Sequence, residues 1–148
     1  RTPRSMPGVE RVVGEGEWRD LLPEADYVVL ATPLTPSTKG IMDTAAFAAM
    51  RDDAYLINIA RGAIIDEPAL IQALETNQIG GAALDTFDEE PLPPDSPLWS
   101  LPNVTITPHA TAHSPRMRER QIALFTENVR RMRAGEPLVN VVDKTAGY

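Results

Sequence analysis

The sequence predicts an α/β fold with a parallel sheet flanked by helices, and three observations predict it. Four short runs, at residues 27–31, 55–59, 80–84 and 104–107, have the length of β-strands. They are mostly apolar rather than regularly alternating, which is typical of strands inside a parallel sheet. Segments of helix-forming composition lie among and after them, and strands that alternate with helices usually pair in parallel.

The first part of the chain contributes one strand and one helix. Residues 27–31 (YVVLA) form a β-branched and apolar run that we expect to be a strand buried on both faces. Residues 44–50 (TAAFAAM) are strong helix formers, and Asp43 or Thr44 can cap that helix.

The middle of the chain repeats this alternation. A second strand is predicted at residues 55–59, and Asp66 can cap a helix that runs to Asn77. Strands follow at residues 80–84 and 104–107. In the helix that begins after Asp66, the positions expected to face the core are Leu70, Ile71 and Leu74.

A last helix is predicted from Pro115 to about Arg133. Its apolar stripe consists of Ile122, Phe125, Val129 and Met132. Six arginines lie elsewhere on it, namely Arg116, Arg118, Arg120, Arg130, Arg131 and Arg133. We interpret them as a solvated face, because cations near a helix C-terminus are favoured by its dipole.

Composition narrows the classes of function. The 148 residues are 43% hydrophobic and 24% charged, as in an ordinary globular domain. The net charge of −7 disfavours binding to nucleic acid. No cysteine is present, which excludes disulfides and thiolate metal sites, and we expect no metal site. No apolar run is as long as the roughly 18 residues that a membrane span needs. We therefore expect a cytoplasmic protein without a membrane partner.

Polar residues recur where the predicted strands end. Alone, each has an ordinary structural explanation as a turn, cap or loop residue. Ligands of parallel sheets bind beyond the carboxyl ends of the strands, so their joint placement predicts a site. These residues are Thr32 and Pro33, Ala60 to Gly62, Asp85, Glu90, Pro108 and His109.

Three of them suit the chemistry of a 2-oxo acid. The planar fork of Arg61 could hold a substrate carboxylate. His109 could donate a proton to a carbonyl oxygen as hydride arrives, because histidine titrates near neutrality. Glu90 would favour the imidazolium and fix its tautomer. His113 competes for the histidine role, but it lacks the preceding proline, and we interpret it as a structural or rim residue.

Three linked segments carry a specific resemblance. They are residues 22–43 (LPEADYVVLATPLTPSTKGIMD), 55–74 (YLINIARGAIIDEPALIQAL) and 81–114 (GAALDTFDEEPLPPDSPLWSLPNVTITPHATAHS). In this order they resemble the signatures of the D-isomer specific 2-hydroxyacid dehydrogenases, from about Leu21 to the C-terminus. The resemblance implies an NAD(P)-dependent oxidoreductase that interconverts a D-2-hydroxy acid and a 2-oxo acid.

The resemblance also implies a role for each site residue. Arg61 would bind the substrate, Glu90 would be the acid partner and His109 the proton donor or acceptor. Asp85 would hold the nicotinamide carboxamide. The positions that would contact the dinucleotide are Thr32, Ile59, Ala60, Arg61, Asp85 and Ala112.

The glycine-rich dinucleotide loop is missing from the sequence. Gly14-Glu15-Gly16 lacks the third glycine of G-x-G-x-x-G and the strand before it. We therefore expect a partial Rossmann-like sheet that lacks the first βαβ unit and the substrate domain. Residues 1–134 would be the C-terminal part of the NAD(P)-binding domain, and residues 135–148 a tail that returns to the absent domain. Such a fragment would be inactive alone, and the full-length protein would be a homodimer.

The cofactor and the class of function stay open. Arg1 and Arg4 would lie near the adenosine ribose, where basic residues accommodate a 2′-phosphate, which favours NADP over NAD. One alternative is a dinucleotide-sensing protein like the transcriptional corepressors that resemble these dehydrogenases, and another is an interaction fragment without chemistry. Fold alone does not separate these functions.

Overall fold

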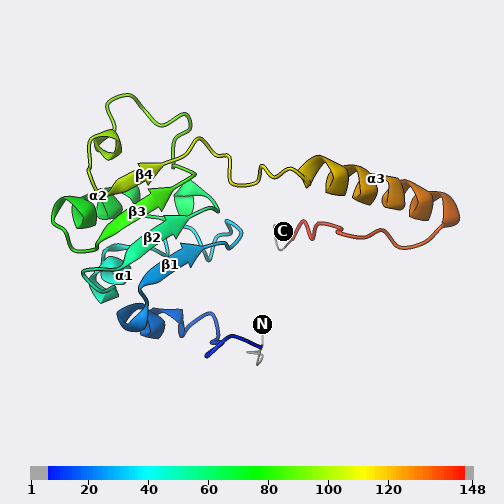
Figure 1. Cartoon of the computed structure of the whole chain (residues 1–148). Coiled ribbons are helices and arrows are strands. Elements are labelled where there is room, and N and C mark those ends of the chain that lie inside the picture. Colours follow the sequence, from blue (N-terminus) through cyan, green and yellow to red (C-terminus); the bar gives the residue numbers. More distant parts are fainter. Residues whose placement is uncertain (1–6, 146–148) are drawn as a thin grey trace.

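The computed structural model describes residues 7–145 and contains one four-stranded parallel sheet. The strands are β1 (Tyr27–Leu30), β2 (Tyr55–Asn58), β3 (Gly81–Leu84) and β4 (Val104–Ile106), arranged in chain order (Figure 1). The sheet register pairs the last residues of all four strands. The loops that follow the strands therefore leave from one edge of the sheet, as the sequence predicts.

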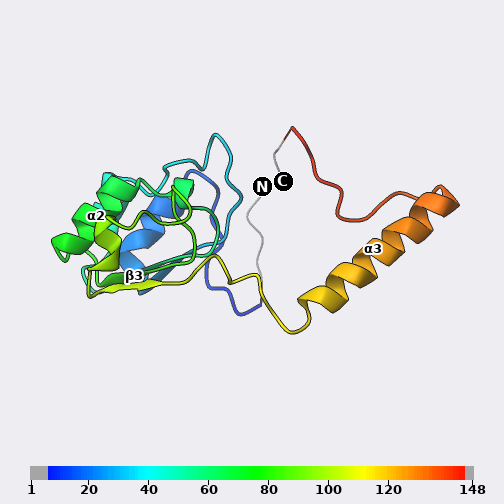
Figure 2. The ribbon, with the colours of Figure 1, turned by 90° about the horizontal axis from the view of Figure 1, so that it is seen from above.

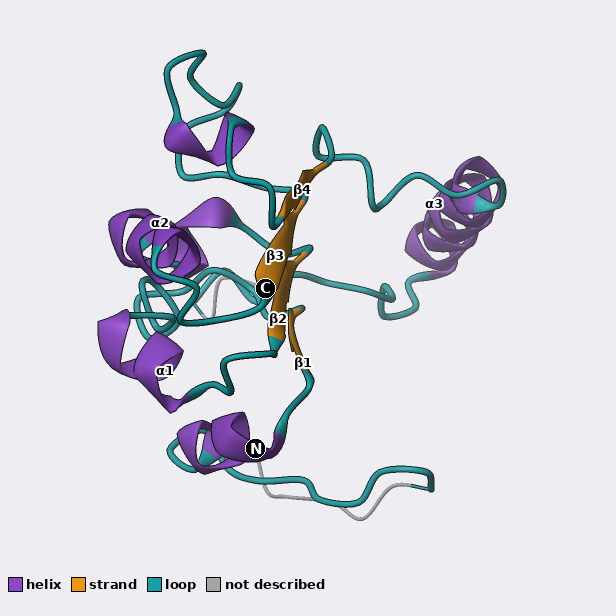
Figure 3. Ribbon diagram, turned by 60° about the vertical axis from the view of Figure 1, so that its left-hand side comes forward, coloured by secondary structure: helices purple, strands orange, loops and turns teal. Residues whose placement is uncertain are grey.

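Helices cover one face of this sheet. The 3-10 helix η1 (Trp18–Glu24), α1 (Thr44–Ala49) and α2 (Glu67–Glu75) lie together on that side in Figure 3. The side chain of Asp43 accepts a hydrogen bond from the backbone N–H of Ala46, and Asp66 accepts one from Ala69. Both predicted N-caps are confirmed, and they satisfy N–H groups that a helix start leaves free.

The core lies between this helical layer and the sheet. It draws on both kinds of element because each strand turns one set of side chains toward the helices. Its largest fully buried apolar side chains are Met42, Phe47, Leu56, Ile64, Leu70, Leu74, Ile79 and Leu98. The predicted fold class, an α/β protein with a parallel sheet and helices, is confirmed.

The opposite face of the sheet is largely open. Tyr27 is 67% exposed and Val29 53%, so the prediction that this strand is buried on both faces was wrong. The reason is that η1, α1 and α2 all pack on the other side, whereas the last helix stands away from the sheet (Figures 1 and 2). An apolar strand sequence does not reveal which layers are present to cover it.

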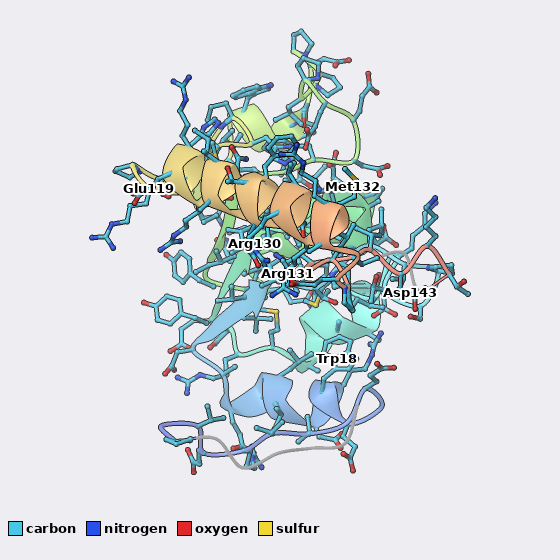
Figure 4. The ribbon with its side chains drawn as sticks, turned by 90° about the vertical axis from the view of Figure 1, so that its right-hand side faces the viewer. Trp18, Glu119, Arg130, Arg131, Met132 and Asp143 are labelled. Atoms are coloured by element: carbon cyan, nitrogen blue, oxygen red, sulfur yellow. The ribbon has the colours of Figure 1, made fainter. Side chains whose placement is uncertain are left out.

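The last helix, α3 (Met117–Ala134), ends at Gly135, whose φ of 69° gives the left-handed cap common at helix C-termini. Ile122, Phe125 and Met132 of its predicted stripe are exposed. Figure 4 views the molecule from this side, with Arg130, Arg131 and Met132 labelled on the helix. Arg130 and Arg131 pair with Glu127, so part of the predicted arginine face carries surface ion pairs.

The tail beyond Gly135 turns back beside α3. The amide of Asn128 donates to the carbonyl oxygen of Val139 and accepts from its N–H, at 3.1 and 2.9 Å. Arg131 donates to the carbonyl oxygen of Pro137. Residues 146–148 of the predicted tail lie outside the described residues.

Three short 3-10 elements were not predicted, because such short pieces carry too little helical periodicity. They are η1, η2 (Gly62–Ile64) and η3 (Pro97–Trp99). Within residues 7–145, no helix combines the length and apolarity that crossing a bilayer requires.

Candidate active site

A pocket of about 380 Å³ opens at the carboxyl ends of β1 and β2. This is the position at which parallel sheets bind ligands, and the volume lies in the range of small-molecule sites. Its lining consists of Ala31, Thr32, Pro33, Leu34, Ile59, Ala60 and Arg61. Four positions predicted to contact the dinucleotide, Thr32, Ile59, Ala60 and Arg61, thus share one pocket.

Asn58, the last residue of β2, shapes the turn that carries Arg61. Its side chain is fully buried, donates to the carbonyl oxygen of Arg61 and accepts from the N–H of Ala60, both at 3.0 Å. The Arg61 guanidinium donates to the carbonyl oxygen of Ala60 at 2.6 Å, and no ion pair occupies it among the described residues. The sequence interpretation missed Asn58, although a lone amide inside the apolar run YLINIA is the signal that could have found it.

Gly62 brings this turn against the loop that follows β3. A Cβ atom on Gly62 would lie 1.8 Å from the carbonyl carbon of Phe87 and 2.3 Å from the backbone nitrogen of Asp88. Only a residue without a side chain fits, because both neighbours are backbone. The loop from Phe87 leads directly to Glu90, so Gly62 packs the arginine turn against the segment that carries the acid.

Glu90 and His109 form a hydrogen-bonded pair. Nδ1 of His109 lies 2.8 Å from Oε2 of Glu90, and Oε1 of Glu90 accepts from the N–H of Phe87 at 3.0 Å. The hydrogen bond with His109 is the largest cause that lowers the pKa of Glu90, and the charge of Arg61 adds a smaller contribution. The three residues predicted to be catalytic are therefore coupled, two by direct contact and the third through its charge.

Asp85 lies beneath the loop that carries His109 and is only 2% exposed. It accepts hydrogen bonds from the hydroxyls of Thr107 and Thr111 and from the N–H groups of Ala110 and Thr111. Burial acts to raise the pKa of Asp85, but these hydrogen bonds together outweigh it and hold the pKa well below the usual range.

Other predicted residues stand apart from this constellation. Ala112 is exposed on the loop after His109 and does not line the pocket. The backbone N–H of His113 donates to Ala110, while its side chain makes no described hydrogen bond. Arg1 and Arg4, which favoured NADP, lie outside the described residues.

The walls of the pocket at the carboxyl ends of β1 and β2 are both polar and apolar. Across residues 7–145, no three His, Asp or Glu side chains gather as a metal site would require. The pocket instead joins apolar walls from Pro33, Leu34 and Ile59 to the hydroxyl of Thr32 and the cation of Arg61.

Residues 3–111 match the model of the D-isomer specific 2-hydroxyacid dehydrogenase, NAD binding domain. A D-isomer specific 2-hydroxyacid dehydrogenase from Xanthobacter autotrophicus, solved with NADPH and MES, is 41% identical to the chain, with a TM-score of 0.91. An NADPH-dependent glyoxylate/hydroxypyruvate reductase from Sinorhizobium meliloti, solved with NADP and sulfate, is 35% identical, with a TM-score of 0.91. A probable 2-hydroxyacid dehydrogenase from Rhizobium etli, solved with NADP, HEPES and L(+)-tartaric acid, is 37% identical, with a TM-score of 0.88.

Each comparison covers all of this chain, which spans 46%, 48% and 47% of those three proteins, respectively. The sheet, the strand-end loops and α3 thus have counterparts in longer proteins. By the extent of the domain match and the level of identity, the chain belongs to the D-isomer specific 2-hydroxyacid dehydrogenase family.

Proposed function

We propose that this chain carries the acid–base and substrate-binding groups of an oxidoreductase that interconverts a D-2-hydroxy acid and a 2-oxo acid. The observation that carries the proposal is the 2.8 Å contact between His109 and Glu90, with Arg61 in the lining of the pocket at the carboxyl ends of β1 and β2. A nicotinamide cofactor, when bound, supplies or accepts the hydride. The chain's own residues handle the proton and the carboxylate.

His109 is suited to proton transfer by the arrangement of its two ring nitrogens. Nδ1 pairs with Glu90, and among the described residues Nε2 has no hydrogen-bond partner. The contact with Glu90 fixes the orientation of the ring, and Nε2 stays available to give a proton to a substrate carbonyl oxygen. In the oxidative direction the same nitrogen accepts the hydroxyl proton.

Arg61 is the group proposed to bind the substrate carboxylate. Its guanidinium is committed to the carbonyl oxygen of Ala60 and to no acid in the described part of the chain, so donors remain for a bidentate contact. We propose small 2-oxo acids as substrates, which agrees with the glyoxylate/hydroxypyruvate reductase to which the chain is similar.

The proposed cofactor is NADP rather than NAD. All three similar structures reported above were solved with NADPH or NADP. Thr32, Ile59, Ala60 and Arg61 would contact its nicotinamide half in the pocket, with Asp85 and Ala112 as further proposed contacts. The sequence holds no glycine-rich phosphate loop, so we propose that these 148 residues alone bind the cofactor weakly and turn nothing over.

The test is steady-state reduction of a panel of 2-oxo acids by the family protein that carries this chain, with His109→Ala and Arg61→Ala. We expect His109→Ala to lower kcat by about 100-fold or more, because general acid catalysis is lost. Arg61→Ala should chiefly raise KM for the 2-oxo acid. His113→Ala and Arg118→Ala are matched controls on the same loop and on α3, and neither should change the rate.

Two results would refute the proposal. If His109→Ala turned over at the wild-type rate, the assignment of His109 as the proton donor would be wrong. If Arg61→Ala kept the wild-type KM and kcat, Arg61 would not bind the substrate carboxylate. A wild-type protein that binds NADP tightly but reduces no acid in the panel would support the dinucleotide-sensing alternative.

A further inference from the structure

The carboxylate of Asp85 has its hydrogen-bonding capacity filled by one loop. Oδ1 accepts from the hydroxyl of Thr107 and from the N–H of Ala110, and Oδ2 accepts from both the N–H and the hydroxyl of Thr111. An ionised carboxylate offers about four acceptor positions, so these four donors leave none unused. All four belong to the five-residue segment with His109 at its centre.

His109 adopts a backbone conformation that needs such support. Its φ of 51° lies in the left-handed region, which is unfavourable for residues other than glycine although histidine tolerates it better than most. Such conformations persist where the surroundings fix them. The anchors of Asp85 lie on both sides, at Thr107 before His109 and at Ala110 and Thr111 after it.

We propose that Asp85 and Thr111 form a latch that fixes this loop and thereby positions His109 against Glu90. Both are positioning residues, because neither contacts the 2.8 Å pair itself. The inference rests on the proposed function for its catalytic consequence. Its structural content, a loop held by a buried carboxylate, stands independently of the substrate.

The chemistry of the latch requires a carboxylate and a hydroxyl. An asparagine at position 85 would place an NH₂ group against one of the pairs of donors, because an amide has a single acceptor oxygen. At position 111, serine keeps the hydroxyl donor, whereas valine keeps the shape and removes it. Thr111→Val removes the hydrogen bond from the hydroxyl and keeps the one from the backbone N–H, so it weakens the latch without changing any charge.

The latch makes a different prediction from a nicotinamide contact at Asp85. If the carboxylate of Asp85 serves the cofactor alone, Asp85→Asn raises the cofactor Kd and Thr111→Val leaves kcat intact. If the carboxylate also holds the loop, Thr111→Val lowers kcat and leaves the cofactor Kd unchanged, whatever contact Asp85 makes with the cofactor.

The experiment measures three quantities in the protein: kcat, the Kd for NADPH by fluorescence titration, and amide hydrogen exchange at Ala110 and Thr111. For Thr111→Val we expect about a tenfold fall in kcat and faster exchange at both amides, with the Kd unchanged. Thr111→Ser should restore kcat. Thr105→Val, an exposed threonine of β4 without a described side-chain hydrogen bond, is the matched control and should change none of the three.

Each outcome decides the proposal. Slow exchange at Ala110 and Thr111 that accelerates in Thr111→Val supports the latch even if the wild-type protein reduces no 2-oxo acid, a result that would overturn only the proposed function. Unchanged exchange in Thr111→Val overturns the latch whatever the activity. A kcat retained in Thr111→Val, together with a raised Kd in Asp85→Asn, overturns it in favour of the cofactor contact alone.

Discussion

Replacing Gly62 by alanine tests whether the arginine turn and the Glu90 loop act as one packed unit. The added Cβ would meet the carbonyl carbon of Phe87 at 1.8 Å, where ordinary contact begins at 3.4 Å, so the loop must retreat by about 1.6 Å. The nearest atoms all belong to backbone, and no side-chain rotation can relieve the overlap. Overpacking of this kind costs about 1–3 kcal/mol.

Gly62→Ala should affect the catalytic rate more strongly than the stability of the fold. The displaced loop carries Glu90, and a misplacement of about 1 Å at a catalytic group can cost about 100-fold in rate. We therefore expect kcat to fall by about 100-fold, and the melting temperature by about 2–4 °C for each kcal/mol lost. Both quantities are accessible from steady-state assays and thermal unfolding followed by circular dichroism.

The matched control for this variant is Gly16→Ala, because a Cβ at Gly16 meets nothing within 4 Å. It should melt and turn over like the wild type. If Gly62→Ala did the same, the Arg61 turn could not be packed against the Phe87 backbone, and the reasoning would fail.

Three further predictions concern single hydrogen-bonding groups. Asn58→Leu leaves two backbone groups unpaired and should destabilise the fold by about 1–3 kcal/mol for each, measured by urea unfolding. The hydrogen bond with Arg19 is the main cause that lowers the pKa of Asp43 from 3.8 to about 2. The contribution of this carboxylate to the stability of the fold is therefore present above pH 3.8 and is lost as the pH falls through about 2. The group is partly exposed, so Asp43→Ala should cost only about 1 kcal/mol at pH 7, and less below pH 2, where the charge that pairs with Arg19 is gone. The pKa of Glu90 lies below its ordinary 4.5, so Glu90→Gln should lower kcat at every pH above 4.5 in a pH–rate profile, whereas a profile equal to that of the wild type would remove its role.

The strands and their parallel direction could be predicted from the sequence because local composition and the alternation with helices indicate them. Short apolar runs that alternate with helices usually form a parallel sheet. Asp43 and Asp66 could be identified as caps because each lies directly before a run of helix formers. The edge at which the site lies then follows from parallel pairing.

The distances within the site could not be predicted in the same way. That Glu90 reaches Nδ1 of His109 depends on the path of the loop between β3 and β4, and sequence alone does not give a loop path. The close approach at Gly62 was hidden for the same reason, because its cause is the Phe87 backbone 25 residues later. The open sheet face was mispredicted because exposure depends on which helices pack there, as Tyr27 shows.

The buried polar side chains show how the site is held, and they allow one more test. Among the described residues they are Asn58, Asp85 and Thr86, all at the ends of β2 and β3. The first two bond to the site loops, whereas the hydroxyl of Thr86 is buried without a partner. If hydrogen bonding rather than polarity matters in this layer, Thr86→Val should stabilise the fold by about 1 kcal/mol, because it removes an unpaired group and keeps the shape. Urea unfolding compares it directly with Asn58→Leu. Equal losses of stability in the two variants would mean that burial alone, and not the hydrogen bonds to the loops, explains why polar residues lie beneath this site.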